Sequence, residues 1–167
     1  MQKFIARSIA VFFGAGLIRP APGTWGSLAA IPAGLGLHVL GGPVLLAIGA
    51  CVAFFVGWWA TLVSTHGQDD HDPSEIVIDE VAGQWIALIP VAIGATHSGA
   101  SILALWPGIL TAFAAFRFFD ILKPGPVGMA DRRHDAFGVM LDDVIAGILA
   151  AFVVMGAAWI SHGLIGV

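Results

Sequence analysis

Hydrophobic and charged positions segregate along this chain into long apolar stretches separated by short charged clusters. The 18 charged residues all lie within Lys3–Arg19, Asp69–Glu80 and Arg117–Asp143. The remaining stretches, residues 20–68, 81–116 and 144–167, contain no Asp, Glu, Lys or Arg. A charge at the centre of a bilayer costs about 2.5–3.5 kcal/mol on insertion scales, so long uncharged stretches are typical of membrane-embedded helices. The sequence therefore predicts an integral membrane protein.

The length of each apolar stretch predicts how many helices it holds. A helix that spans a bilayer needs about 20 residues. The stretches of 49, 36 and 24 residues should hold two, two and one helices, with turns at Gly41-Gly42-Pro43 and His97-Ser98-Gly99. We predict an all-α, polytopic membrane helical bundle that forms a single domain over residues 1–167. Its five expected membrane-embedded helices are Leu28–Leu40, Val44–Ser64, Glu80–Thr96, Ala100–Phe119 and Asp142–His162.

The paired crossings predict that all three charged clusters lie on one face of the membrane. All seven Lys and Arg residues belong to these clusters. Basic loops face the cytoplasm in most membrane proteins, so we expect the charged face and the N-terminus to be cytoplasmic and the C-terminus to be outside. The composition agrees, with 58% hydrophobic residues and a mean hydropathy of +0.92. The 22 glycines suit helices that pack closely in lipid.

Two points of this topology stay open at the level of the sequence. The run Ser8–Ile18, which follows two basic residues, resembles the apolar region of a signal peptide. The following Arg19-Pro20-Ala21-Pro22 is a poor cleavage site, which favours an interfacial or re-entrant helix. The helix Leu28–Leu40 is short for a span and contains Pro32, so it is expected to be tilted or only partly inserted.

Two pairs of adjacent acids stand where polar segments enter predicted membrane helices. These pairs are Asp79-Glu80 and Asp142-Asp143. Acids at a helix N-terminus have a structural explanation, because they cap free amides and oppose the helix dipole. Two adjacent acids on each of two helices exceed what capping requires, and membrane boundaries desolvate carboxylates unless a cation compensates them. Oxygen ligands without nearby thiols favour a hard ion, so the pairs predict a Mg²⁺ site.

Basic residues in the third cluster accompany these acids. The cluster contains Arg117, Asp120, Lys123, Asp131 and Arg132. One interpretation is a snorkelling arginine and a basic patch attracted to anionic lipid. Together, however, the cations offer donors for a phosphate beside carboxylates for a metal, which is a recurrent way to hold a phosphoryl group.

A turn after the first cluster offers a third wall for such a site. Prolines at positions 20 and 22 stop the preceding helix, and Gly23 permits a sharp turn. Thr24 is the expected N-cap of the next helix. Amides at a helix start bind anions, so this turn is a candidate phosphate cradle.

Several longer motifs resemble those of the phosphatidylglycerophosphatase A family. They are Pro22–Ser27, Ile76–Glu80 with Gly83, Phe116–Pro124, Asp131-Arg132 and Gly138–Gly147, and they occur in order over nearly the whole chain. The resemblance implies an α-helical, Mg²⁺-dependent lipid phosphatase of the bacterial inner membrane. Its expected substrate is phosphatidylglycerophosphate and its product phosphatidylglycerol.

The resemblance also implies which residues carry the reaction. The motif positions of the family are occupied here by Asp79, Glu80, Asp120, Lys123, Asp131, Asp142 and Asp143. We expect Asp79, Glu80, Asp142 and Asp143 to bind the metal, and Asp79, Asp120 and Asp142 to be catalytic. Thr24, Arg117, Lys123, Asp131 and Arg132 are the expected substrate-binding residues. A water activated by the metal is the favoured attacking group, with a carboxylate of Asp120 or Asp142 as the rival.

The sequence offers less support for functions other than a phosphatase. A CDP-alcohol phosphotransferase also acts on lipid phosphates with Mg²⁺, but its Asp-Gly and Ala-Arg motif with later spaced aspartates in one helix is absent from this sequence. A small transporter or channel would need ionisable groups near mid-membrane. No basic stripe indicates nucleic-acid binding. The sequence leaves the oligomeric state open, including a homo-oligomer.

Overall fold

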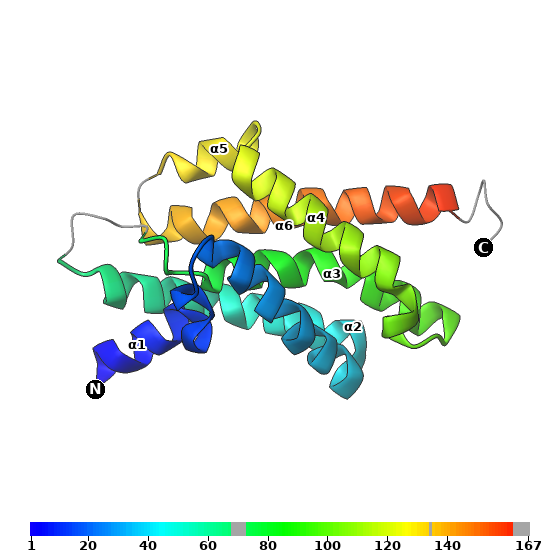
Figure 1. Cartoon of the computed structure of the whole chain (residues 1–167), viewed down its shortest axis with the longest axis horizontal. Coiled ribbons are helices and arrows are strands. Elements are labelled where there is room, and N and C mark those ends of the chain that lie inside the picture. Colours follow the sequence, from blue (N-terminus) through cyan, green and yellow to red (C-terminus); the bar gives the residue numbers. More distant parts are fainter. Residues whose placement is uncertain (68–72, 134, 162–167) are drawn as a thin grey trace.

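The computed structural model describes residues 1–67, 73–133 and 135–161, which form helices and no strands. The elements are α1 (Gln2–Ala10), η1 (Phe12–Leu17), α2 (Pro22–Thr65), α3 (Ile78–Ser98), η2 (Ile102–Leu105), α4 (Trp106–Leu122), α5 (Pro126–Asp131) and α6 (Ala136–Ile160). They form an elongated bundle whose long helices run roughly along one direction (Figure 1). The prediction of an all-α bundle is confirmed.

The long helix α2 is a helical hairpin. The backbone leaves helical geometry at Gly41 and at Gly42, whose φ is 67°, and Pro43 starts the returning half. Figure 1 shows the two halves running in opposite directions, and a Cβ on Gly49 would lie 2.6 Å from the Leu37 side chain in the other half. The predicted turn is therefore confirmed. Within the described residues, four helices are long and apolar enough to cross a membrane, and because α2 has two halves, they account for five predicted segments.

Two predicted helix starts are wrong. Helix α6 begins at Ala136 rather than at Asp142, because the Asp135 side chain caps it by accepting a hydrogen bond from the Gly138 amide at 2.6 Å. The acids at 142 and 143 therefore lie inside the helix and cap nothing. Helix α2 begins at Pro22 rather than Leu28, with Ala21 as its N-cap, so the expected capping role of Thr24 is also wrong.

The other boundaries differ from the prediction by a few residues. Helix α3 ends at Ser98, and the following Gly99, with a φ of 66°, closes the predicted turn. The expected helix 100–119 is divided into η2 and α4, and α4 continues to Leu122. The predicted end of the last helix at His162 lies outside the described residues.

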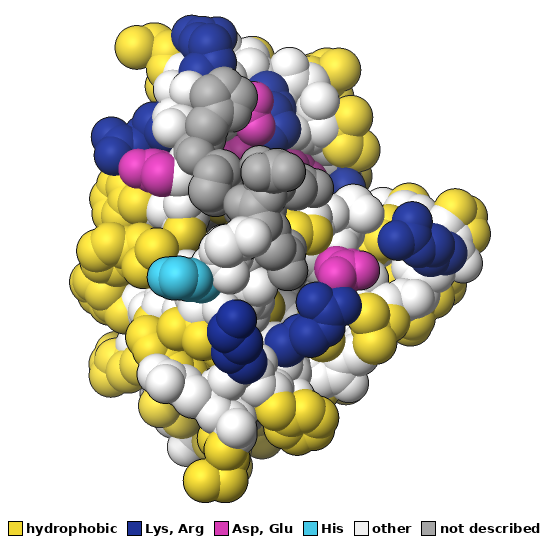
Figure 2. Space-filling view, turned by 90° about the vertical axis from the view of Figure 1, so that its left-hand side faces the viewer, with side chains coloured by type: hydrophobic (Ala, Val, Ile, Leu, Met, Phe, Trp, Pro, Cys, Tyr) yellow, Lys and Arg dark blue, Asp and Glu magenta, His cyan; other side chains and the backbone are white. Residues whose placement is uncertain are grey.

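The charged clusters meet at one end of the bundle, as predicted. Figure 2 shows that end, where Lys, Arg, Asp and Glu side chains gather inside a surround of hydrophobic ones. Three ion pairs join residues far apart in the sequence: Arg7 to Glu75 at 2.6 Å, Arg117 to Glu80 at 3.8 Å and Lys123 to Asp142 at 2.6 Å. Helix α1 belongs to this end, because its Ala10 carbonyl accepts a hydrogen bond from the Val77 amide at 2.9 Å.

Helices α3 and α6 start at this charged end and cross at two glycines. A Cβ on Gly147 would lie 2.9 Å from the Cα of Gly83, and a Cβ on Gly83 would lie 2.5 Å from the Asp143 carbonyl oxygen. Only glycines permit backbones to approach this closely, as in other membrane helix pairs. Asp79 lies four residues before Gly83 and Asp143 four before Gly147, so the crossing places these acids on adjoining turns.

Replacement of Gly147 by alanine tests this crossing. The added methyl meets backbone atoms that cannot move without separating the helices, so we expect Gly147→Ala to destabilise the protein by about 1–3 kcal/mol. Gly156→Ala is the matched control, because a Cβ there meets nothing within 4 Å. Thermal unfolding in detergent should show a lower Tm for Gly147→Ala and an equal or higher Tm for Gly156→Ala. Equal effects of the two substitutions would contradict the crossing.

Candidate functional site

Three carboxylates from α3 and α6 converge at the charged end. Asp79 and Glu80 lie in the first turn of α3, and Asp143 comes from α6. Each offers one oxygen, and these oxygens all lie within 4.8 Å of one another. Asp79 and Asp143 are only 7% and 3% exposed. We call these three residues the carboxylate cluster. Their spacing and burial suit a cation, because unscreened like charges so close would otherwise repel strongly.

Asp142, predicted to belong to the same group, has a different environment. Its Oδ1 accepts a hydrogen bond from the Asp143 amide at 2.9 Å, and its Oδ2 lies 2.6 Å from Nζ of Lys123. Lys123 follows the end of α4 and also pairs with Asp131 at the end of α5. We call Lys123, Asp131 and Asp142 the ion-pair cluster. It connects the end of α4 to α5 and α6, beside the carboxylate cluster.

Lys123 stays protonated in this setting. Its partial burial lowers the pKa of the ammonium group, but hydrogen bonds and charge attraction from Asp131 and Asp142 outweigh that effect and raise the pKa well above its usual value. Lys123 is therefore a fixed positive charge at the boundary between the polar end and the apolar part of the bundle.

Arg117 connects α4 to the carboxylate cluster and to α2. One of its terminal nitrogens lies 2.5 Å from Oδ2 of Asp120 and 3.8 Å from Oε1 of Glu80. The same nitrogen donates a hydrogen bond to the Ser27 hydroxyl at 3.4 Å. The Arg117 side chain is 15% exposed. Arg117 and Asp120, both predicted from the sequence, thus lie beside Glu80.

The start of α2 adjoins this arginine, as the predicted third wall requires. A Cβ on Gly23 would collide with Oε1 of Glu80 and lie 3.1 Å from the Arg117 terminal nitrogen. The Thr24 amide already donates to the Ala21 carbonyl at 3.0 Å. The Thr24 hydroxyl, which bonds no described residue, is therefore the group of this residue that is free for a ligand.

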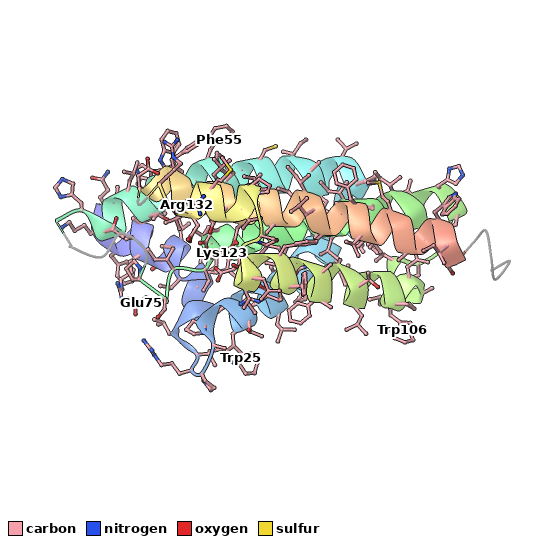
Figure 3. The ribbon with its side chains drawn as sticks, turned by 90° about the horizontal axis from the view of Figure 1, so that it is seen from above. Trp25, Phe55, Glu75, Trp106, Lys123 and Arg132 are labelled. Atoms are coloured by element: carbon pink, nitrogen blue, oxygen red, sulfur yellow. The ribbon has the colours of Figure 1, made fainter. Side chains whose placement is uncertain are left out.

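Arg132, unlike Arg117 and Lys123, has no ion pair with a described carboxylate. It follows α5 and is exposed. Figure 3 shows Arg132 and Lys123 toward the charged half of the molecule and Trp106 near the opposite end. Arg132 is thus available at the surface, whereas Lys123 is engaged in the ion-pair cluster.

Sequence reasoning missed Gln84 and Ser27. Gln84 lies one turn beyond Glu80 on α3 and is fully buried, yet neither its amide oxygen nor its nitrogen has a partner among the described residues. Glu80 Oε2 and Arg117 Nε are also buried without partners. Leaving such groups unpaired is costly, so they indicate a place for water or a polar ligand. The sequence did contain one signal for Gln84, because it is the one polar side chain in the otherwise apolar run 81–95.

Comparisons with known proteins give a consistent result. Residues 8–158 match the sequence model described as phosphatidylglycerophosphatase A. A Haemophilus influenzae protein named phosphatidylglycerophosphatase A is 44% identical, with 87% of this chain and 84% of the relative aligned. An Escherichia coli protein of the same name is 33% identical over 86% of this chain and 77% of its own length.

Another relative has a different name. A Bacteroides thetaiotaomicron protein, provisionally named a phosphatidylinositol-3-phosphatase, is 35% identical over 95% of this chain and 96% of its own length. No solved structure matches the chain.

Loss of the Lys123 charge tests the ion-pair cluster. Lys123→Gln removes the cation that pairs with the Asp142 carboxylate. The Asp142 side chain is only 6% exposed, so its charge would then be buried without a partner cation. Breaking a buried pair from one side costs about 3–5 kcal/mol, and the 30% exposure of Lys123 reduces this to about 1–3 kcal/mol. We expect a clearly lower Tm, partly restored in the double variant Lys123→Gln/Asp142→Asn.

Arg133→Gln is the control for this experiment. It removes a pair with Asp135 whose side chains are 51% and 48% exposed. Exposed pairs contribute little, so its Tm should change by at most a degree or two. A Tm of Lys123→Gln as high as that of Arg133→Gln would show that the cluster does not hold the helices together.

Proposed function

The chain belongs to the phosphatidylglycerophosphatase A family, and we propose that it hydrolyses the terminal phosphomonoester of phosphatidylglycerophosphate to phosphatidylglycerol and phosphate. The observation that carries the proposal is the carboxylate cluster beside Arg117, at the polar end of a bundle that can span a membrane. A transporter would need ionisable groups near mid-membrane, whereas the described Asp, Glu, Lys and Arg residues belong to the clusters that meet at one end.

The position of the site suits a lipid phosphate. The acids lie where α3 and α6 leave the apolar part of the bundle, and the outer faces of the helices expose many large hydrophobic side chains. The acyl chains of a substrate therefore stay in the bilayer while the headgroup reaches the carboxylates. Phosphatidylglycerophosphate places its terminal phosphate at the end of a short polar headgroup, which matches this depth.

We propose Mg²⁺ as the cofactor of this reaction. Asp79, Glu80 and Asp143 would hold it, because their oxygens converge and Glu80 Oε2 is buried without a hydrogen-bond partner. All are carboxylate oxygens, the ligands that hard divalent cations prefer. Asp142, which the sequence also suggested as a ligand, would instead act beside the metal through Lys123. When bound, Mg²⁺ neutralises charge on phosphoryl oxygens.

Residues around the carboxylate cluster would bind and orient the phosphate headgroup. The Arg117 guanidinium orients the phosphoryl group, and Asp120 fixes the guanidinium from 2.5 Å away. The Thr24 hydroxyl and the exposed Arg132 offer further donors at the edge of the site. Lys123, held by Asp131 and Asp142, adds positive charge near the headgroup.

The same contacts favour water as the attacking group. Asp120 is paired with Arg117 and Asp142 with Lys123, so neither carboxylate is free to attack phosphorus. In the hydrolysis, water oxygen forms a bond to phosphorus and the bond from phosphorus to the glycerol oxygen breaks. A proton from the water ends on that glycerol oxygen.

The relative from Bacteroides thetaiotaomicron supports a second candidate substrate. Its name indicates phosphatidylinositol 3-phosphate, which is also a lipid with a phosphomonoester headgroup. A carboxylate cluster with an arginine would serve either headgroup. The match of residues 8–158 to the family favours phosphatidylglycerophosphate.

We propose that the protein lies in the bacterial inner membrane with its charged end in the cytoplasm. All seven basic residues lie in the three clusters that meet at this end, which is the distribution of cytoplasmic loops. Single-cysteine labelling of intact cells, in a Cys51→Ala background, tests the orientation: a probe at Arg133 should react only from the cytoplasmic side.

Phosphate release by the purified protein tests the activity. We expect release from phosphatidylglycerophosphate in the presence of Mg²⁺, little release with a chelator, and slower release from phosphatidylinositol 3-phosphate. Release that is independent of divalent ions would contradict the metal proposal, and faster release from the inositol lipid would reverse the order of substrates. No release from either lipid with any divalent ion would exclude the phosphatase.

Exchanges of Asp for Asn separate metal binding from structure. Asp79→Asn and Asp143→Asn keep the size of the side chain but remove a charge that attracts Mg²⁺, so each should lower kcat at least about a hundredfold. The control is Asp135→Asn on the same helix as Asp143, because asparagine also caps a helix and Asp135 lies outside the cluster. Its turnover should stay within about twofold of wild type, and similar losses in all three variants would contradict the assignment.

A further inference from the structure

A shallow apolar groove runs along α4 on the outside of the bundle. Its volume is about 450 Å³, and it is lined by Leu110, Thr111, Ala114, Ala115, Phe118 and Phe119 of α4 with Val153 of α6. The α4 residues recur every four positions and so form one continuous stripe on the helix. The hydroxyl of Thr111 donates to the Pro107 carbonyl at 2.8 Å, which satisfies the one side-chain polar group of the lining.

Along α4, the groove ends next to residues of the candidate site. Its upper end is formed by Phe118 and Phe119, whose rings pack edge to face with centroids 5.4 Å apart. The next residue is Asp120, which pairs with Arg117, and Lys123 follows after one more turn. A molecule in the groove therefore has its upper end beside the charged residues that we assign to the headgroup.

The length of the groove corresponds to one leaflet of a bilayer. From Leu110 to Phe119 the helix rises about 13 Å, at 1.5 Å per residue. Half of a hydrocarbon core is about 15 Å thick. The groove is therefore nearly as long as one leaflet of the hydrocarbon core is thick, which is the length that an acyl chain occupies.

A second apolar groove leads to apolar residues instead. It is lined by the returning half of α2, from Pro43 to Val56, and by Ile89 and Ile93 of α3. Its part nearest the charged end is Val56, and the next residue, Gly57, packs against the side chains of Ile78 and Met140. No charged residue follows directly on the lining of this groove, as Asp120 does on α4.

We propose that the groove between α4 and α6 binds an acyl chain of the lipid substrate and so positions the headgroup phosphate at the carboxylate cluster. This proposal rests on the proposed lipid phosphatase function. Burial of each methylene group in an apolar groove is favourable, so the groove should contribute to the affinity for long-chain substrates and less to that for short-chain ones.

Filling the groove with a large side chain tests the proposal. Ala114 is exposed in the middle of the stripe, and Ala114→Trp should displace the chain from the groove. The experiment compares KM for dioleoyl and dihexanoyl phosphatidylglycerophosphate in detergent. We expect the ratio of the two KM values, long-chain over short-chain, to rise about tenfold, equivalent to losing the burial of about two methylene groups.

Two further variants keep the test decisive. Ala157→Trp is the matched control, because Ala157 is exposed on α6 outside the groove, and its KM ratio should equal that of wild type. Val153→Trp fills the groove from the other wall and carries the same expectation as Ala114→Trp, which covers a failure of either variant to fold.

The possible failures are distinguishable. An unchanged KM ratio in the folded groove variants would mean that the groove holds only bulk lipid, and the proposal would be overturned while the phosphatase stands. A wild-type protein that hydrolyses neither chain length would overturn the phosphatase and the groove together.

Discussion

The contact between Gly83 and Gly147 determines where the carboxylates of the site lie. It brings the backbones of α3 and α6 together, with a space too small for a Cβ on either side. Each glycine lies one helical turn beyond an acid, so the contact presses Asp79, Glu80 and Asp143 into one small volume. Desolvated like charges oppose this arrangement. Packing of the two backbones and compensating cations must therefore offset the repulsion.

Two cations, Arg117 on α4 and Lys123 directly after it, provide part of that compensation and also join the helices of the bundle. Arg117 contacts α2 through Ser27 and α3 through Glu80, while Lys123 contacts α5 and α6 through Asp131 and Asp142. Each cation is neutralised largely by its nearest acid. Negative charge therefore remains in the carboxylate cluster, and the buried, unpaired oxygen of Glu80 is consistent with a cation that binds there. The stability of the bundle and the chemistry proposed for it thus depend on the same few charges.

The sequence predicted the parts of this structure that follow from the cost of burying charge. The uncharged stretches located the long apolar helices, and the glycines at 41 and 42 located the hairpin turn. It failed for α6 because the helix starts at the Asp135 cap, outside the apolar stretch, so Asp142 and Asp143 lie within the helix. A membrane boundary and a helix boundary are set by different forces.

The sequence could not predict that Asp142 pairs with Lys123 while Asp143 joins the carboxylate cluster, and the reason is different. Asp142 and Asp143 are adjacent, but successive residues on a helix point about 100° apart, and only the neighbouring helices decide what each one meets. Asp142 forms an ion pair with Lys123, while the contact between Gly83 and Gly147 places Asp143 beside the acids of α3. Gln84 was missed for a similar reason, because its burial without a partner becomes visible only when the helices are packed together.

Anomalous diffraction from crystals grown with Mn²⁺ in place of Mg²⁺ would test the proposed metal site most directly. We expect a peak within ligand distance of carboxylate oxygens of Asp79, Glu80 and Asp143, with Asp142 still paired to Lys123. Mn²⁺ bound instead between Asp131 and Asp142, with Lys123 displaced, or no Mn²⁺ at the carboxylate cluster, would contradict this arrangement.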